Sequence, residues 1–163
     1  MLHFLAFTAR LIERKARVRI LDDVCERPVS PFDIGITATH RVMNELIAQR
    51  LRRSQQLQHI RVDTPERWQG LQRLVTIAVH PLSGMLRPSS FDLETGRLCV
   101  MASRHRAGLV VVGRDHIGET LDHLIVGADQ PLGRPDVAGR GHHQHLRFWK
   151  SLEARKRIVH VSR

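Results

Sequence analysis

The chain has 163 residues, of which 42% are hydrophobic and 26% charged, a composition typical of a folded domain and unlike that of a disordered chain. Its two cysteines, Cys25 and Cys99, exclude a disulfide scaffold and a four-cysteine zinc site. No apolar run reaches the roughly 18 residues that span a bilayer, and the opening MLHFLAFTARL is a poor signal peptide, so we expect a cytoplasmic protein without membrane contact.

The net charge of +10 favours a polyanionic partner such as nucleic acid or the phosphates of a nucleotide. The basic residues are mainly arginines, whose planar guanidinium binds two phosphate oxygens at once. A GC-rich genome would produce the same arginine bias without any function. Aromatic residues make up only 4% of the chain, which disfavours a protein that holds single strands mainly by stacking bases on aromatic rings.

Apolar periodicity predicts strands that alternate with helices. In chain order, the predicted strands are 17–21, 34–39, 59–64, 74–79, 109–113 and 158–161. The predicted helices are 41–53, 91–106 with an interruption or late start at Gly96, 118–125 and 142–156; the predicted loops are 25–33, 80–90 and 127–141. On the first helix, the side expected to face the core carries Val42, Met43, Leu46, Ile47 and Leu51. Alternation of apolar strands and helices predicts an α/β fold with a mostly parallel sheet covered on both faces.

The first segment with side chains suited to chemistry is ITATHRVMNELI, residues 36–47. A strand ends there, Thr39 is placed to cap a helix, and Arg41 falls in the first helical turn. A cation gains nothing from the helix dipole at that end. Arg41 therefore either faces a bound anion or is a solvated surface residue.

The second segment is VDTPERWQGLQ, residues 62–72. Thr64 and Pro65 fit a helix cap followed by the first helical position. Gly70 allows a close approach of the backbone to a ligand. The alternative is a plain strand–turn–helix connection with Trp68 packed against it.

The third segment is GRLCVMASRHRAGLVVVG, residues 96–113, in which Arg104 and Arg106 precede the most apolar strand. An arginine at a cleft stabilises charge on a transferring phosphoryl group. Residues two apart do not share a helix face, so we expect one arginine to face a cleft and the other to brace it, unless both lie on the surface. Because ligands of open parallel sheets bind beyond strand ends, we expect the three segments to meet at one edge.

In order and spacing, the three segments resemble motifs of the second RecA-like domain of superfamily 1 helicases, in the subgroup of the nonsense-mediated-decay helicase. That family has TP-x-R at a strand end, then T-x-x-x-x-QG-x-E, then LNVALTRAR-x-G-LIIVG. The counterparts here are TATHR (37–41), TPERWQGLQ (64–72) and LCVMASRHRAGLVVVG (98–113). The part beyond Gly113 is similar to the tail of actinobacterial members. The resemblance implies a three-layer RecA-like domain with a C-terminal extension over residues 30–163, preceded by an incomplete linker or domain edge at 1–29.

The resemblance also implies roles for individual residues on the nucleotide side. Arg104 matches the arginine that contacts the γ-phosphate of ATP, and Arg106 is the second arginine of that motif. Arg41 matches an arginine turned toward the nucleotide phosphates. His105 departs from the family, which has a small residue between the two arginines.

The middle motif couples the nucleotide to the nucleic-acid strand. The resemblance implies that Thr64, together with His40 of TATHR, contacts the strand, and that Gln69, Gly70 and Gln72 line the nucleotide side. Gln72 stands where the family has glutamate, so it keeps the capacity to hydrogen-bond and loses the charge.

No G-K-S or G-K-T occurs in the chain, and in the family the phosphate loop and the acidic pair for magnesium belong to the first RecA-like domain. We therefore expect ATP and Mg²⁺ to bind only together with that domain, and this chain alone to be an inactive half-site from a split gene, a truncated reading frame or a remnant. The expected partners are single-stranded DNA or RNA and an upstream RecA-like domain or chain.

Two rival hypotheses remain. One is a non-catalytic basic α/β remnant that binds nucleic acid or protein, and the other is a phosphate-ester enzyme using Asp115 and His116, although adjacent side chains rarely face one another. His142, His143 and His145 are one, two and three residues apart, and no supporting carboxylate is evident beside them, so we predict no metal site.

Overall fold

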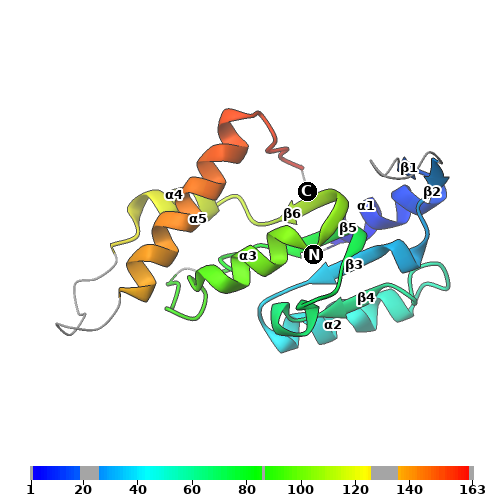
Figure 1. Cartoon of the computed structure of the whole chain (residues 1–163), viewed down its shortest axis with the longest axis horizontal. Helices are drawn as coiled ribbons and strands as arrows, with labels where there is room; N and C mark the ends of the chain where they lie inside the picture. Colours follow the sequence, from blue (N-terminus) through cyan, green and yellow to red (C-terminus); the bar gives the residue numbers. More distant parts are fainter. Residues whose placement is uncertain (1, 19–25, 86, 126–135, 162–163) are drawn as a thin grey trace. The chain divides into compact units, whose positions relative to one another are not determined.

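A computed structural model describes residues 2–18, 26–85, 87–125 and 136–161 of the chain (Figure 1). Cys25 and residues 19–21 of the first predicted strand lie outside these ranges. The chain divides into two compact units. Unit 1 comprises Met1–His80 and Cys99–Val112, and unit 2 comprises Pro81–Leu98 and Gly113–Arg163.

Unit 1 is built on a four-stranded sheet in which every strand is parallel to its neighbours. The strands are β3 (Ile34–Thr37), β4 (Arg61–Asp63), β5 (Arg73–Val79) and β6 (His105–Val112), in the order β4-β3-β5-β6. Helices α1 (Leu2–Glu13) and α2 (Arg41–Arg52) flank the sheet (Figure 1). The predicted α/β class with a parallel sheet is confirmed, and the arrangement is that of a three-layer RecA-like domain.

The core of unit 1 lies on the two central strands, which are apolar because parallel strands are covered on both faces. Ile34 and Ile36 of β3 and Ile77 of β5 are fully buried. From α2, Ile47 and Leu51 pack into the same cluster.

The connection from β4 to β5 crosses β3, and its tryptophan, Trp68, packs against that strand. It contains the short 3-10 helix η2 (Pro65–Trp68), and the Trp68 ring is fully buried. The Trp68 Nε1–H donates a hydrogen bond to the carbonyl of Ile36 at 3.3 Å. Gly35 is required beneath the ring, since a Cβ there would overlap it. The guanidinium groups of Arg61 and Arg73 lie over the ring, 5.4 and 5.7 Å from its centroid.

Helix α2 forms where it was predicted, but its inward face differs. Asn44, Ile47 and Leu51 are buried, at the i, i+3, i+7 spacing of one face. Val42 and Leu46, expected in the core, are 68% and 43% exposed. Ile47 and Leu51 were predicted correctly, but Val42 and Leu46 were not. The prediction considered apolar residues only, whereas the buried face of α2 includes the hydrogen-bonded Asn44.

Other predicted boundaries also change. The helix expected over 91–106 is the shorter α3 (Thr95–Ser103), and β6 already begins at His105, so Arg106 lies in a strand. The described part of the first predicted strand is β1 (Arg17–Val18), which pairs antiparallel with β2 (Arg27–Pro28) in the predicted loop. Helix α1 was not predicted. Its residues Leu5, Ala9, Leu11 and Ile12 pack against the core.

Unit 2 contains α4 (Ile117–His123) and α5 (Val137–Ala154). Leu82, Leu93, Ile117 and Leu121 form its buried cluster, with Trp149 among the partly buried residues packed against it. Helix α5 begins inside the stretch 127–141 that was predicted to be a loop. The predicted strand at 158–161 is wrong, since these residues are described and have no strand.

Candidate functional site

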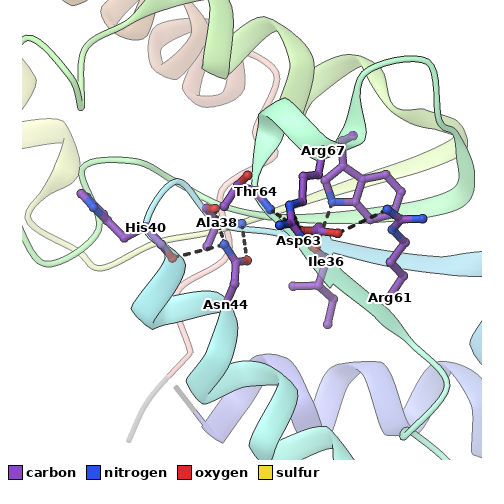
Figure 2. Close-up of polar contacts among 9 residues, drawn as sticks. Ile36, Ala38, His40, Asn44, Arg61, Asp63, Thr64 and Arg67 are labelled. Atoms are coloured by element: carbon purple, nitrogen blue, oxygen red, sulfur yellow. Dashed lines mark hydrogen bonds and ion pairs between the residues drawn. The ribbon is translucent and has the colours of Figure 1, made fainter.

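The first group of candidate residues lies beyond the carboxyl end of β3. Thr37, Ala38 and Thr39 are buried, so within residues 37–41 only His40 and Arg41 reach solvent. Asn44 fixes the loop: its Oδ1 accepts from the Ala38 N–H at 3.1 Å, and its Nδ2 donates to the carbonyls of Ala38 at 2.7 Å and His40 at 3.2 Å. In Figure 2 the His40 ring projects away from this network.

Asp63 organises the neighbouring end of β4. Its carboxylate accepts from the Thr64 N–H at 3.3 Å and pairs with Arg61 at 3.2 Å and with Arg67 at 3.7 Å (Figure 2). The Thr64 side chain makes no cap hydrogen bond although Thr64 stands at the N-cap of η2. Because the carboxyl ends of neighbouring parallel strands lie at one edge of a sheet, Thr64 shares this carboxyl edge with His40 and Arg41.

Other candidates lie at the opposite, amino edge. Gln72 and Arg104 immediately precede β5 and β6, and the Arg73 N–H donates to the Arg104 carbonyl at 2.9 Å, which ties the two strand starts together. The half-buried Arg104 donates from Nε and Nη2 to the Ser103 hydroxyl, at 3.2 and 2.8 Å. Arg106, within β6, is exposed.

Gln69 and Gly70 lie on the connection that runs between the two edges. Both are exposed, Gln69 closes η2, and Gly70 has φ +75°, a left-handed conformation that glycine adopts without strain. The space where a Cβ of Gly70 would stand is open.

The expectation that all three segments meet at one edge is wrong. Thr37 is level with Ala78, whereas Arg73 is level with His105. Five residues of β5 separate these levels, about 17 Å at 3.3 Å per residue. Arg41 and Arg104 therefore stand at opposite ends of the sheet, too far apart to grip one phosphate. The error came from treating segments that precede β5 and β6 as if they followed strands.

Comparison with protein-family models matches residues 8–116 to AAA_12, an AAA domain. The chain belongs to this family. Domains of this family occur in superfamily 1 helicases related to the nonsense-mediated-decay helicase. No curated protein matches the chain. The match includes the whole β4-β3-β5-β6 sheet and every candidate residue named from the sequence.

The helicase-like AAA domain contains two site-forming residues that the sequence did not single out. Asn44 and Asp63 are positioning residues: their side chains hydrogen-bond to the backbone of the segments around His40 and Thr64. An asparagine among apolar helix residues was the signal available for Asn44. Asp63, directly before Thr64, had no signal beyond its charge.

The remaining clusters of this AAA domain do not form sites. Asp115 pairs with His160 at 3.2 Å, and the His116 ring contacts the Leu82 carbonyl at 3.2 Å, so Asp115 and His116 make no dyad. Among the described residues, no three His, Cys, Asp or Glu side chains are grouped to hold a metal. No helix in the described ranges is long and apolar enough to cross a membrane.

Proposed function

We propose that this AAA domain is the second RecA-like domain of an ATP-dependent helicase of the nonsense-decay subgroup and actinobacterial type, acting in the cytoplasm. It supplies the arginine-bearing side of a nucleotide site whose phosphate loop comes from an upstream RecA-like domain or chain. In this proposal the amino edge faces the nucleotide and the carboxyl edge faces a single strand of DNA or RNA.

The position of Arg104 and Gln72 at the starts of the neighbouring strands β6 and β5 supports the assignment of the amino edge to the nucleotide. Arg104 is held by Ser103 through two of its nitrogens, which orients the planar guanidinium at little further entropic cost. The donors that remain suit the oxygens of a polyphosphate, with Arg106 adding a second charge and Gln72 a hydrogen bond. Gln69 and Gly70 lead into this edge. We assign magnesium to no residue of the described ranges.

The carboxyl edge supports the strand side. His40, Arg41 and Thr64 are polar residues of its two loops that reach solvent, as do Glu66 and Arg67 of η2. The separation of about 17 Å from the amino edge removes Arg41 from the phosphate that Arg104 would contact. Contacts from these side chains would be made to phosphate and sugar, so single-strand binding is expected to show little sequence preference and to weaken steeply as the salt concentration rises.

A second candidate function is a non-catalytic strand-binding module that has lost the motor. Gln72 favours it, since a neutral amide stands where the family carries a carboxylate. This candidate retains salt-sensitive strand binding and gives no response to nucleotide.

The test is strand-stimulated ATP hydrolysis with the upstream phosphate-loop domain supplied in trans. Arg104→Ala is expected to lower the hydrolysis rate about 10³-fold or more, the range of an arginine that stabilises phosphoryl-transfer charge. Arg147→Ala, which removes an exposed arginine from α5, is the matched control and is expected to leave the rate unchanged. Equal rates for Arg104→Ala and the wild type would refute the arginine role. Strand binding without any hydrolysis by the wild-type pair would select the non-catalytic module.

A further inference from the structure

An exposed aromatic pair stands on unit 1 outside the residues discussed so far. Phe32 is 67% exposed although it belongs to a hydrogen-bonded turn, the 3-10 helix η1 (Pro31–Asp33). Its ring stacks on the imidazole of His59, with ring centroids 5.2 Å apart and an interplanar angle of 23°. His59 supports one side of the Phe32 ring, and the exposed area leaves ring surface for a further flat group.

The pair lies on the amino edge of the sheet. Phe32 comes just before β3, and His59 comes just before β4. Along that edge the strand order places His59, Phe32, Gln72 and Arg104 one after another. Phe32 is two strands away from Arg104, about 10 Å at the usual strand spacing.

The turn that carries Phe32 is fixed by its neighbour Asp33. The Asp33 carboxylate accepts from both the N–H and the hydroxyl of Ser30, at 2.9 and 2.6 Å, and forms two hydrogen bonds of 2.6 Å with the Arg27 guanidinium. The hydrogen bonds from Arg27 lower the pKa of Asp33 to about 2, so the carboxylate is charged at neutral pH. A ring held in this way loses little freedom when a ligand stacks on it.

The segment that precedes His59 in the chain carries positive charge, which suits a ligand with phosphates. The last turn of α2 and its C-cap present Arg50, Arg52 and Arg53 to solvent, and the chain then leads to His59. Phe91, the comparable exposed phenylalanine of unit 2, differs because the Arg97 guanidinium covers its ring at 3.8 Å. A flat group joined to phosphates is the chemistry of a nucleotide unit.

We propose that Phe32, backed by His59, is a stacking platform for one unpaired nucleobase. The base belongs either to a bound single strand or to a free nucleotide on the amino edge, since every base offers a π-face. The proposal rests on the proposed function for its ligand class, and adds that one base is held by stacking in a chain otherwise poor in aromatic residues.

The experiment measures binding by the full chain of three probes: a single strand containing 2-aminopurine, whose fluorescence falls on stacking, an abasic strand of the same length, and adenosine monophosphate. The variants are Phe32→Leu, which keeps apolar bulk, and Phe32→Trp, which keeps a ring. Phe91→Leu is the matched control. Phe32→Leu is expected to weaken a base-bearing probe about 5- to 150-fold and to abolish the fluorescence change, with the abasic strand unaffected. Phe32→Trp retains binding.

The affected probe identifies the source of the base. Weakening of the 2-aminopurine strand alone assigns it to the single strand, and weakening of adenosine monophosphate alone assigns it to the nucleotide. Unchanged affinity of both base-bearing probes in Phe32→Leu, or equal losses for the base-bearing and abasic strands, overturns the platform. Those results leave the Arg104 hydrolysis test untouched, so failure of the platform and failure of the proposed function are distinguishable.

Discussion

Asn44 holds the loop that presents His40 and Arg41, and we predict that Asn44→Ala destabilises unit 1 severely. The substitution removes three hydrogen bonds: one from the Ala38 N–H, and one each to the carbonyls of Ala38 and His40. Ala38 is only 2% exposed, so water cannot replace the amide. A buried polar group left unsatisfied costs about 1–3 kcal/mol, and two such groups on Ala38 give a loss of about 2–6 kcal/mol.

Urea unfolding followed by circular dichroism measures this loss as a change in the free energy of unfolding. Gln49→Ala is the matched control because it removes an exposed amide from the same helix, and we expect it to change stability by less than about 0.5 kcal/mol. In conditions where Asn44→Ala is still folded, single-strand affinity is expected to fall with it, since the loop backbone is released. Equal stability of the two variants would refute the assignment of the loop geometry to Asn44.

Three further predictions concern stability. Burial lowers the pKa of His145 from 6.5 to about 4, so between these pH values the unfolded chain binds a proton that the folded chain does not. The contribution of His145 to the free energy of unfolding is therefore complete above pH 6.5 and declines by about 3 kcal/mol as the pH falls to 4. Urea titrations at each pH should show this decline in the wild type and not in His145→Gln. The hydrogen bonds from Arg27 hold the pKa of Asp33 near 2 instead of 3.8, so the contribution of Asp33 to folding stability is present above pH 3.8 and lost toward pH 2. Asp33→Asn is expected to lower the free energy of unfolding by about 2 kcal/mol at pH 7 and by little at pH 2. An equal loss at both pH values would contradict this prediction. Gly35→Ala places a Cβ into the Trp68 ring, and this overpacking is expected to destabilise the fold by about 1–3 kcal/mol and to lower the melting temperature. Gly108→Ala is the control that we expect to be tolerated, because its Cβ would meet only Val75, at 4.0 Å.

Much of the sheet could be predicted from the sequence because buried parallel strands are apolar on both faces. Residues 34–39 and 74–79 read as strands for that reason, and β3 and β5 are found there. The start of β6 was missed because its first residues, His105 and Arg106, are polar and extend past the buried part of the sheet. Apolar periodicity detects burial, and it does not detect backbone pairing at a polar strand end.

The site could be predicted in its residues but not in its arrangement. Every candidate residue of the three motifs lies in unit 1, and the chemical roles of these residues remain predictions. Their division between two edges follows from strand direction: Arg41 comes after β3, whereas Arg104 comes before β6. Both strands run the same way, so the two arginines separate by the length of the sheet. Spacing along the sequence carries no such information until the strand boundaries are known.

The division into two edges constrains how a ligand at one edge can affect the other. Residues 64–72 join the edges, and Trp68 fixes the middle of this segment in the core through the Ile36 carbonyl and the gap above Gly35. Moving the segment as a whole along the sheet would therefore require extracting a fully buried indole from close packing against β3. Under the proposed function, the packing of that ring therefore opposes a change in the spacing between a strand held at Thr64 and a nucleotide contacted near Gln72.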